Sequence, residues 1–215
     1  MRRRLIEGGP DGFHDYELLE YLLALAIPRQ DVKPLAKALL ERFGDLPTVI
    51  SASPGELMRV KGVGESVVAA IRFVGAISVR QLQRKAFSQP LLSSLDAVRD
   101  YLHVRLAHEL TEEFRVLFLD NKNRLIRDER FGEGTVNQAP AYPREIAKRA
   151  LELQASALIL VHNHPAGDPT PSRDDVTMTR AIAEAAKAVG VRVHDHLVIA
   201  RSGDASLKAL GLFSG

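Results

Sequence analysis

The sequence predicts an α+β protein in which a small all-α domain precedes a mixed β-sheet flanked by helices, an α/β/α arrangement. Three observations support this prediction. Residues 15–86 form a series of helical patterns, residues 112–127 form two strand-like runs joined by a turn, and later strands alternate with helices. With 215 residues, 46% of them apolar, the chain is long enough for one large domain or two small ones.

Three helices are expected before Gly62, in the N-terminal part of the chain. Asp15 is placed to cap the first helix. A second helix is expected over residues 31–43, because Pro34 falls in its first turn and Gly44 directly follows its end. A short helix is expected over residues 54–59.

Two glycines separated by one apolar residue then lie between two short helices. Gly62 and Gly64 form a turn that resembles that of a helix-hairpin-helix. Glycines let a phosphate approach the backbone at a helix start, so these residues, with Lys61 and Arg72, are candidate contacts to DNA. The alternative is a hairpin used only for packing, and Glu65 beside the turn opposes phosphate binding.

Charge adds a modest argument for nucleic acid. The net charge of the whole chain is only +2, which does not indicate a strong polyanion binder. Residues 66–95 nevertheless contain four basic residues and no acidic one. The alternative is an ordinary solvated helix face.

Residues 87–94 interrupt the helical pattern with Ser and Pro, and the domain boundary is placed there. The prediction is a helix-hairpin-helix domain over 1–86, a linker over 87–94 and a second domain over 95–215. The second domain is expected to contain, in order, a helix over 95–109, strands over 112–120 and 124–127, a helix over 143–153, a strand over 157–161, a helix over 172–189, a strand over 191–200 and a short helix over 207–210.

Two histidines follow the apolar strand at residues 157–161. His162 and His164 lie two residues apart, so on an extended backbone they project from the same face. Asp175 lies at the start of the next helix, where its carboxylate is expected to return close to the two histidines. Two neutral imidazoles and one carboxylate are a common ligand set for zinc, with the fourth position left to water. The alternative is a capping box in which Ser172 and Asp175 only satisfy the first amides of the helix.

The spacing H-x-H-x(7)-S-x-x-D resembles the JAMM metal motif of the JAB/MPN metallohydrolases. The run from His162 to Ser172 resembles the RadC branch of that family. The resemblance covers residues 95–215 and, more weakly, the N-terminal helices. It implies a JAB/MPN-like mixed sheet between helices and one zinc ion per chain, held by His162, His164 and Asp175. It also implies hydrolysis of a peptide or isopeptide bond in a protein or peptide substrate.

The same resemblance assigns the catalytic residues. JAMM enzymes use a glutamate at the start of a strand upstream of the two histidines as general base, and Glu112 matches that place. Glu113 is the nearest rival, since alternation along a strand sends the two to opposite faces. The alternative is that both are surface glutamates. Ser172 is assigned the stabilisation of the developing oxyanion.

A second pair of histidines lies near the end of the chain. His194 and His196 could form a rival metal site. The RadC branch has a similar Asp-His pair at this place, so Asp195 or His196 is instead expected to support the metal ligands by hydrogen bonding.

Composition excludes several classes of protein. There are no cysteines, which excludes disulfides and thiolate metal sites. No run reaches the roughly 18 apolar residues of a membrane helix. The basic start lacks the apolar segment of a secretory signal, so a cytoplasmic protein without membrane contact is expected.

Three functions remain consistent with these residues. The first is a zinc-dependent hydrolase of the JAMM type, a metalloprotease. The second is a DNA-associated repair or recombination protein that binds or cleaves branched or single-stranded DNA through residues 1–86. The third is a non-enzymatic module with a structural zinc.

Overall fold

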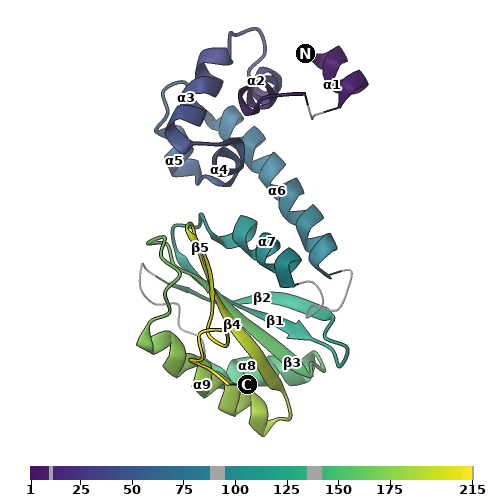
Figure 1. Ribbon diagram of the computed structural model, residues 1–215, viewed down its shortest axis with the longest axis vertical. Helices are drawn as coiled ribbons and strands as arrows, with labels where there is room; N and C mark the ends of the chain where they lie inside the picture. The colour runs from purple at the N-terminus through teal and green to yellow at the C-terminus, as the bar shows by residue number, and fades with distance from the viewer. Residues whose placement is uncertain (10–11, 88–94, 135–141, 215) are drawn as a thin grey trace. The chain divides into compact units, whose positions relative to one another are not determined.

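The computed structural model describes residues 1–9, 12–87, 95–134 and 142–214 (Figure 1). It confirms the predicted fold class, because a helical N-terminal region precedes a five-stranded mixed sheet with helices. The chain divides into two compact units, Met1–Ser78 and Val79–Gly215. Within the described residues, we find no helix with both the length and the apolar character needed to cross a membrane.

The first unit is built from helices alone. Their bounds are α1 (Arg2–Gly8), α2 (Asp15–Ala26), α3 (Lys33–Phe43), α4 (Leu46–Ser51), α5 (Pro54–Met58) and the first part of α6 (Glu65–Phe87). Side chains from α2 to α6 share one apolar core, which includes the fully buried Leu23, Leu39, Leu57 and Ile71. This core is what turns several short helices, marginal on their own, into one folded unit.

The start of α2 differs from the prediction. His14, and not Asp15, is the N-cap, and its backbone N–H donates to the Glu17 carboxylate at 3.0 Å. Asp15 instead accepts a hydrogen bond from the backbone N–H of Leu46 at 3.1 Å. It therefore ties α2 to the first turn of α4, a contact between segments distant in sequence.

The division between the units also differs from the predicted boundary. We expected the helical domain to extend to residue 86, but the division falls inside α6. Val79, Leu82 and Ala86 belong to a core of the second unit, so the end of α6 packs there. Of the predicted linker 87–94, residues 88–94 lie outside the described part of the chain.

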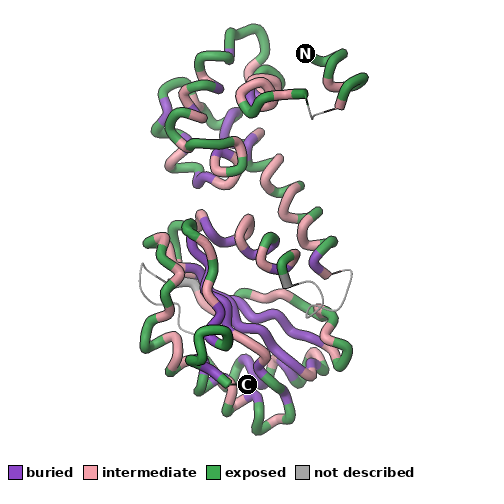
Figure 2. Tube along the Cα trace, in the orientation of Figure 1, coloured by how far each residue is buried: buried purple, intermediate pink, exposed green. Residues whose placement is uncertain are grey.

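The second unit is a mixed sheet covered by helices. Its elements are the end of α6, α7 (Leu95–Leu106), β1 (Glu112–Leu119), β2 (Leu125–Gly134), α8 (Pro143–Glu152), β3 (Ala157–Asn163), α9 (Arg173–Ala188), β4 (Arg192–Ala200) and β5 (Gly203–Ser206). The strand order is β2-β1-β3-β4-β5, with β3 and β4 parallel and the other pairs antiparallel. Strand β3 is therefore central, and all seven of its residues are buried (Figure 2).

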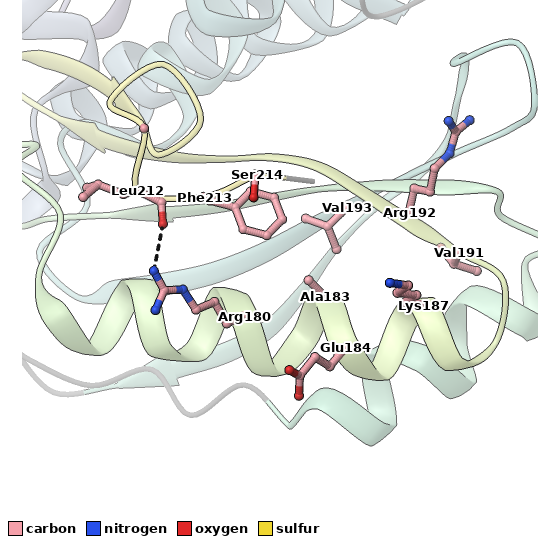
Figure 3. A pocket seen from close by; sticks show the side chains of 11 residues that line it. Arg180, Ala183, Glu184, Lys187, Val191, Arg192, Val193, Leu212, Phe213 and Ser214 are labelled. Atoms are coloured by element: carbon pink, nitrogen blue, oxygen red, sulfur yellow. Dashed lines mark hydrogen bonds between the residues drawn. The ribbon is translucent and has the colours of Figure 1, made fainter.

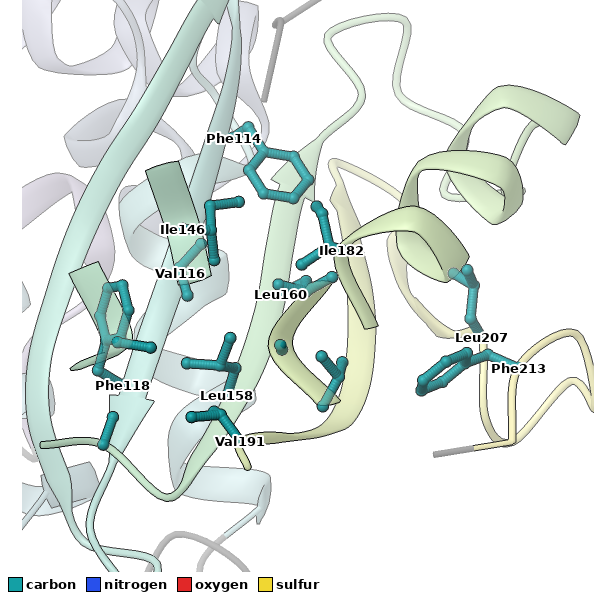
Figure 4. Close-up of a cluster of buried hydrophobic side chains, with 14 of the residues drawn as sticks. Phe114, Val116, Phe118, Ile146, Leu158, Leu160, Ile182, Val191, Leu207 and Phe213 are labelled. Atoms are coloured by element: carbon teal, nitrogen blue, oxygen red, sulfur yellow. The ribbon is translucent and has the colours of Figure 1, made fainter. Parts of the chain in front are cut away.

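Alternation along β3 sends its side chains into two cores. Leu158 and Leu160 pack with Ile146 of α8 and Ile182 of α9 (Figure 4). Ile159 and Val161 pack on the opposite face, in the core that contains α7. His162, next in the same alternation, therefore shares the face of Leu158 and Leu160.

Two predictions near strand ends were incomplete. Strand β2 continues to Gly134 and does not end at Arg127. It is an edge strand that pairs with β1 through backbone hydrogen bonds, and its charged residues lack the apolar pattern by which a strand is predicted. The predicted helix at 207–210 is a turn, and β5 before it was not expected. Neither difference changes the sheet face on which His162 lies.

Candidate metal centre

Strand β3 delivers two imidazoles to one point at its carboxyl end. The backbone N–H of His164 still donates to Ile199 of β4 at 2.8 Å, so the extended conformation persists through both histidines. A turn then forms at Gly167, whose φ of 95° favours glycine. The Nδ1–H of His164 donates to the carbonyl of Asp168 at 2.9 Å, so Nε2 is the ring nitrogen that faces Asp175.

Helix α9 brings the carboxylate back. Ser172 is its N-cap, and the Asp175 N–H donates to the Ser172 hydroxyl oxygen at 3.1 Å. The Asp175 Oδ2 accepts from the backbone N–H and the hydroxyl of Ser172, at 2.6 and 2.7 Å. The other oxygen, Oδ1, lies 3.2 Å from Nε2 of His162. The Asp175 carboxylate thus caps the start of α9 and at the same time faces the two histidines.

The geometry of this cluster suits a tetrahedral metal ion. The candidate ligand atoms of His162, His164 and Asp175 all lie within 4.8 Å of one another. The two Nε2 atoms are 2.9 Å apart, and the Asp175 oxygens lie 3.2 and 3.5 Å from them. Ligands held at 2.0–2.1 Å around tetrahedral zinc are themselves about 3.3 Å apart. Among the described residues, this is the one such group of His, Asp or Glu.

Electrostatics in the cluster favour an ionised carboxylate. Burial acts to raise the pKa of Asp175, but its contacts with the imidazoles of His162 and His164 and its hydrogen bonds from Ser172 outweigh burial and hold this pKa well below its usual range. The hydrogen bond to Asp175 raises the pKa of His164 above its ordinary value, with a smaller part from the charge of Glu112.

The structure places Glu112 and Glu113 on opposite faces of β1. Glu112 shares its face with Phe114, whose ring stacks on that of His162 with centroids 6.4 Å apart. Glu113 is buried on the other face, and its carboxylate pairs with Arg115 at 3.0 Å. Of the two glutamates, Glu112 is the one on the face of the histidine cluster.

Asn163 fixes the backbone on both sides of Glu112. Lying between the two histidines, it points to the other face of β3 and is 1% exposed. Its Oδ1 accepts from the N–H of Glu113 at 2.8 Å, and its Nδ2 donates to the carbonyl of Thr111 at 3.0 Å. Sequence reasoning missed this role, although strand alternation alone gives the direction of the side chain.

The second pair of histidines does not converge. His194 Nε2 lies 2.8 Å from Asn123 Oδ1, in the turn between β1 and β2. His196 is buried and lies with Nε2 2.8 Å from Nδ1 of His162. The register shift between β3 and β4 falls at residue 194, which separates the two side chains. Burial, with a smaller contribution from the charge of His162, lowers the pKa of His196 well below its ordinary value.

Asp195 has a different set of partners. In the described part of the chain, its carboxylate accepts from the N–H of His196, the N–H of Lys208 and the hydroxyl of Ser206. It therefore holds β4 to the segment that follows β5. Asp195 contacts the backbone of His196 and none of the three candidate ligands in the bonds described.

A surface groove lies apart from this cluster. It has a volume of about 610 Å³ and runs between α9, the start of β4 and the segment after β5 (Figure 3). Arg180 and Lys187 line it above an apolar floor that includes Val193 and Phe213. The candidate ligands His162, His164 and Asp175 are not among its described lining residues, so the groove is separate from the candidate metal site.

The candidate DNA contacts all belong to the first unit. Lys61, Gly62 and Gly64 lie in the turn between α5 and α6, and Arg72 is exposed on α6. Gly62 has φ of 95°, which requires glycine. Gly64 has no such backbone requirement, and a Cβ there would meet nothing within 4 Å. The fold itself therefore does not explain why position 64 is glycine.

Comparison with known proteins covers nearly the whole chain. A family model described as RadC-like JAB domain matches residues 92–212, and one described as UPF0758 N-terminal matches residues 2–69. A UPF0758 protein of Rhodobacter capsulatus is 53% identical over 212 residues, 99% of each chain. A UPF0758 protein of Ruegeria pomeroyi is 51% identical over 98% of this chain and 94% of that protein. These matches confirm the family resemblance inferred from the motif.

The bonds of Asn163 lead to a stability prediction. Replacing Asn163 by Ala leaves the N–H of the buried Glu113 without its side-chain partner and removes the bond to the carbonyl of Thr111. We expect the free energy of unfolding to fall by about 1–3 kcal/mol, measured by urea denaturation. The matched variant Asn121→Ala, at an exposed turn position, should change it by less than about 0.5 kcal/mol. Equal small effects of both variants would contradict this role of Asn163.

Proposed function

The chain belongs to the RadC-like JAB domain family, whose fold is that of the JAMM metallohydrolases, and on this premise we propose that it is a zinc-dependent hydrolase of peptide or isopeptide bonds. The observation that carries the proposal is the cluster of His162, His164 and Asp175, with ligand atoms within 4.8 Å of one another. A protein or peptide is the proposed substrate, and the proposed activity is that of a metalloprotease.

The donor set of the cluster fits zinc. With no cysteine in the chain, the available ligands are imidazole and carboxylate, and both suit a borderline divalent ion. The proposed ligand atoms are Nε2 of His162, Nε2 of His164 and one carboxylate oxygen of Asp175. When bound, zinc supplies a Lewis acid that polarises a carbonyl and lowers the pKa of water to about 7.

Glu112 is the proposed general base. Its place at the start of β1, on the face of the histidine cluster, allows its carboxylate to accept a proton from the attacking water. It can then return this proton to the leaving amine. The hydrogen bonds of Asn163 hold the backbone on either side of Glu112, from which this side chain extends.

Ser172 is the proposed donor to the oxyanion. Its hydroxyl lies 2.7 Å from Asp175 Oδ2, at the edge of the ligand cluster. A hydroxyl rotates freely about its C–O bond, so it can donate to an oxygen of the substrate from the same place. Donors aimed at developing negative charge are often a large part of catalysis in acyl transfer.

A purely structural zinc is the weaker alternative. Structural zinc sites are almost always closed by four protein ligands. The group found among the described residues contains three, and Glu112 starts β1 on the same face of the sheet as His162. Three protein ligands leave a fourth position for water, which is the arrangement of a catalytic site.

The metal ligands are tested by zinc content. We expect the wild-type chain to bind one zinc and His162→Ala to lose stoichiometric zinc, measured by elemental analysis after gel filtration. The matched variant His194→Ala should keep its zinc, because that imidazole bonds to Asn123 in another part of the sheet. Zinc retained in His162→Ala and lost in His194→Ala would place the site elsewhere.

The general base is tested by two isosteric variants. Glu112→Gln should keep zinc and the fold but hydrolyse peptide or isopeptide substrates about 10²–10⁴-fold more slowly, because an amide cannot accept the proton from water. Glu113→Gln should weaken the pair with Arg115 and lower stability, with a rate per folded molecule close to wild type. An active Glu112→Gln beside an inactive Glu113→Gln would reverse the assignment.

Contact with DNA is a second candidate function, favoured by one observation. Gly64 is exposed, and nothing in the fold occupies the space of its missing side chain. A glycine at the start of α6 leaves room for a phosphate to approach the backbone amides. We propose non-specific DNA binding by the first unit through Lys61, Gly62, Gly64 and Arg72.

A salt titration of the full chain tests this candidate. Binding to single-stranded and duplex DNA, followed by fluorescence anisotropy, should weaken steeply with salt because neutralised phosphates release counterions. Gly64→Val should bind more weakly than the matched variant Gly55→Val, at another exposed glycine with open space around it. Absence of binding at low salt would reject the candidate, and unchanged binding by Gly64→Val would leave the hairpin as a packing element.

A further inference from the structure

A chain of buried hydrogen bonds runs from the backbone of α9 to the imidazole of His162. The hydroxyl of Thr179 lies 2.5 Å from the carbonyl oxygen of Asp175, one helical turn before it. The same hydroxyl lies 2.6 Å from Nδ1 of His196. Nε2 of His196 lies 2.8 Å from Nδ1 of His162. Three contacts therefore connect α9, β4 and β3 through side chains.

The direction of the first bond is fixed by chemistry. A carbonyl oxygen only accepts, so the single hydrogen of the Thr179 hydroxyl must lie between it and Asp175. The hydroxyl oxygen can then only accept from His196. Nδ1 of His196 must therefore carry a proton.

The direction of the bond between His196 and His162 follows from the direction of the bond between Thr179 and His196. With its proton on Nδ1, a neutral His196 presents the lone pair of Nε2 to His162. Nδ1 of His162 must then be the donor. The remaining nitrogen of His162 is Nε2, which lies 2.9 Å from His164 Nε2 and 3.2 Å from Asp175 Oδ1.

Water is kept away from the whole chain of bonds. Thr179 is 0% exposed, and His162 and His196 are each 1% exposed. The ring of Phe114 lies against both imidazoles, with centroids 6.4 Å from His162 and 5.6 Å from His196. Because a buried polar group without a partner is costly, the bonded arrangement is preferred over alternatives that break it.

We propose that Thr179 is a positioning residue that, through His196, holds His162 in the tautomer protonated at Nδ1, with Nε2 bare and aimed at the proposed metal position. This inference rests on the proposed function only in taking His162 as a metal ligand. Asp175 therefore has two roles. Its backbone carbonyl sets the direction of these hydrogen bonds, and its carboxylate faces Nε2 of His162.

Loss of the Thr179 hydroxyl removes the acceptor that keeps the proton of His196 on Nδ1. His196 can then carry its proton on Nε2 and donate to Nδ1 of His162. That reversal places the proton of His162 on Nε2, where it competes with a metal ion. Partners of this kind in other metal sites change metal affinity by about 10–100-fold.

The chain offers a matched pair of variants for the test. Thr179→Val removes the hydroxyl at nearly constant volume, and Thr179→Ser keeps it. Thr177→Val is the control, because the Thr177 hydroxyl makes the same bond to the carbonyl four residues earlier, at 3.0 Å, but is exposed on α9. The probe is zinc chloride in competition with a chromophoric chelator.

We expect Thr179→Val to bind zinc about 10–100-fold more weakly, with Thr179→Ser and Thr177→Val close to wild type. Unchanged zinc affinity in a folded Thr179→Val would overturn the proposal. So would equal weakening in Thr177→Val, since that would indicate a general effect on α9.

A second measurement uses the metal-free wild-type chain. Long-range ¹H–¹⁵N spectra should show His196 protonated at Nδ1 and bare at Nε2, with a proton on Nδ1 of His162. A proton on Nε2 of His196 would overturn the proposal without any variant. If the wild type fails to bind zinc, the proposed function fails, whereas these spectra still decide the direction of the bonds.

Discussion

The carboxylate of Asp175 is the group on which the rest of the candidate metal site depends. One of its oxygens satisfies the first turn of α9 through Ser172, and the other faces His162. The start of the helix and the ends of the histidine side chains are therefore held together by one ionised group. The low pKa of this carboxyl follows from the same contacts, because each of them stabilises its charged form.

The cluster also depends on where β3 lies in the sheet. A central strand buried on both faces leaves no room for polar side chains unless each finds a partner. His162 bonds to His196 on one face, and Asn163 bonds to the backbone around Glu112 on the other. No side-chain nitrogen or oxygen buried among the described residues lacks a hydrogen-bond partner. The polar groups of the site are thus continuous with the packing of the core.

Asn163 and Thr179 support the site without being candidate metal ligands themselves. Asn163 acts on the backbone beside Glu112, and Thr179 acts on His162 through one intervening imidazole. Both side chains are almost fully buried, so their hydrogen bonds have no competition from water. Supporting bonds of this kind hold the side chains and backbone of a site in place before a substrate arrives.

The sequence by itself determined the features that depend on neighbours in the chain. The α+β class, the apolar strand before His162, the helix that starts at Ser172 and the convergence of His162 and His164 all follow from local periodicity and spacing. The alternation that separates Glu112 from Glu113 follows in the same way, although the sequence left open which of them faces the histidines.

Tertiary structure decided the features that join distant segments. His162 meets His196 across 34 positions, His196 meets Thr179 across 17, and Asn163 meets Glu113 across 50. Asp15 likewise leaves its expected capping role for a partner 31 residues away. The end of α6 joins the second unit because its apolar residues complete that core. No local pattern encodes such pairings, because they arise only when the sheet order and helix packing bring the segments together.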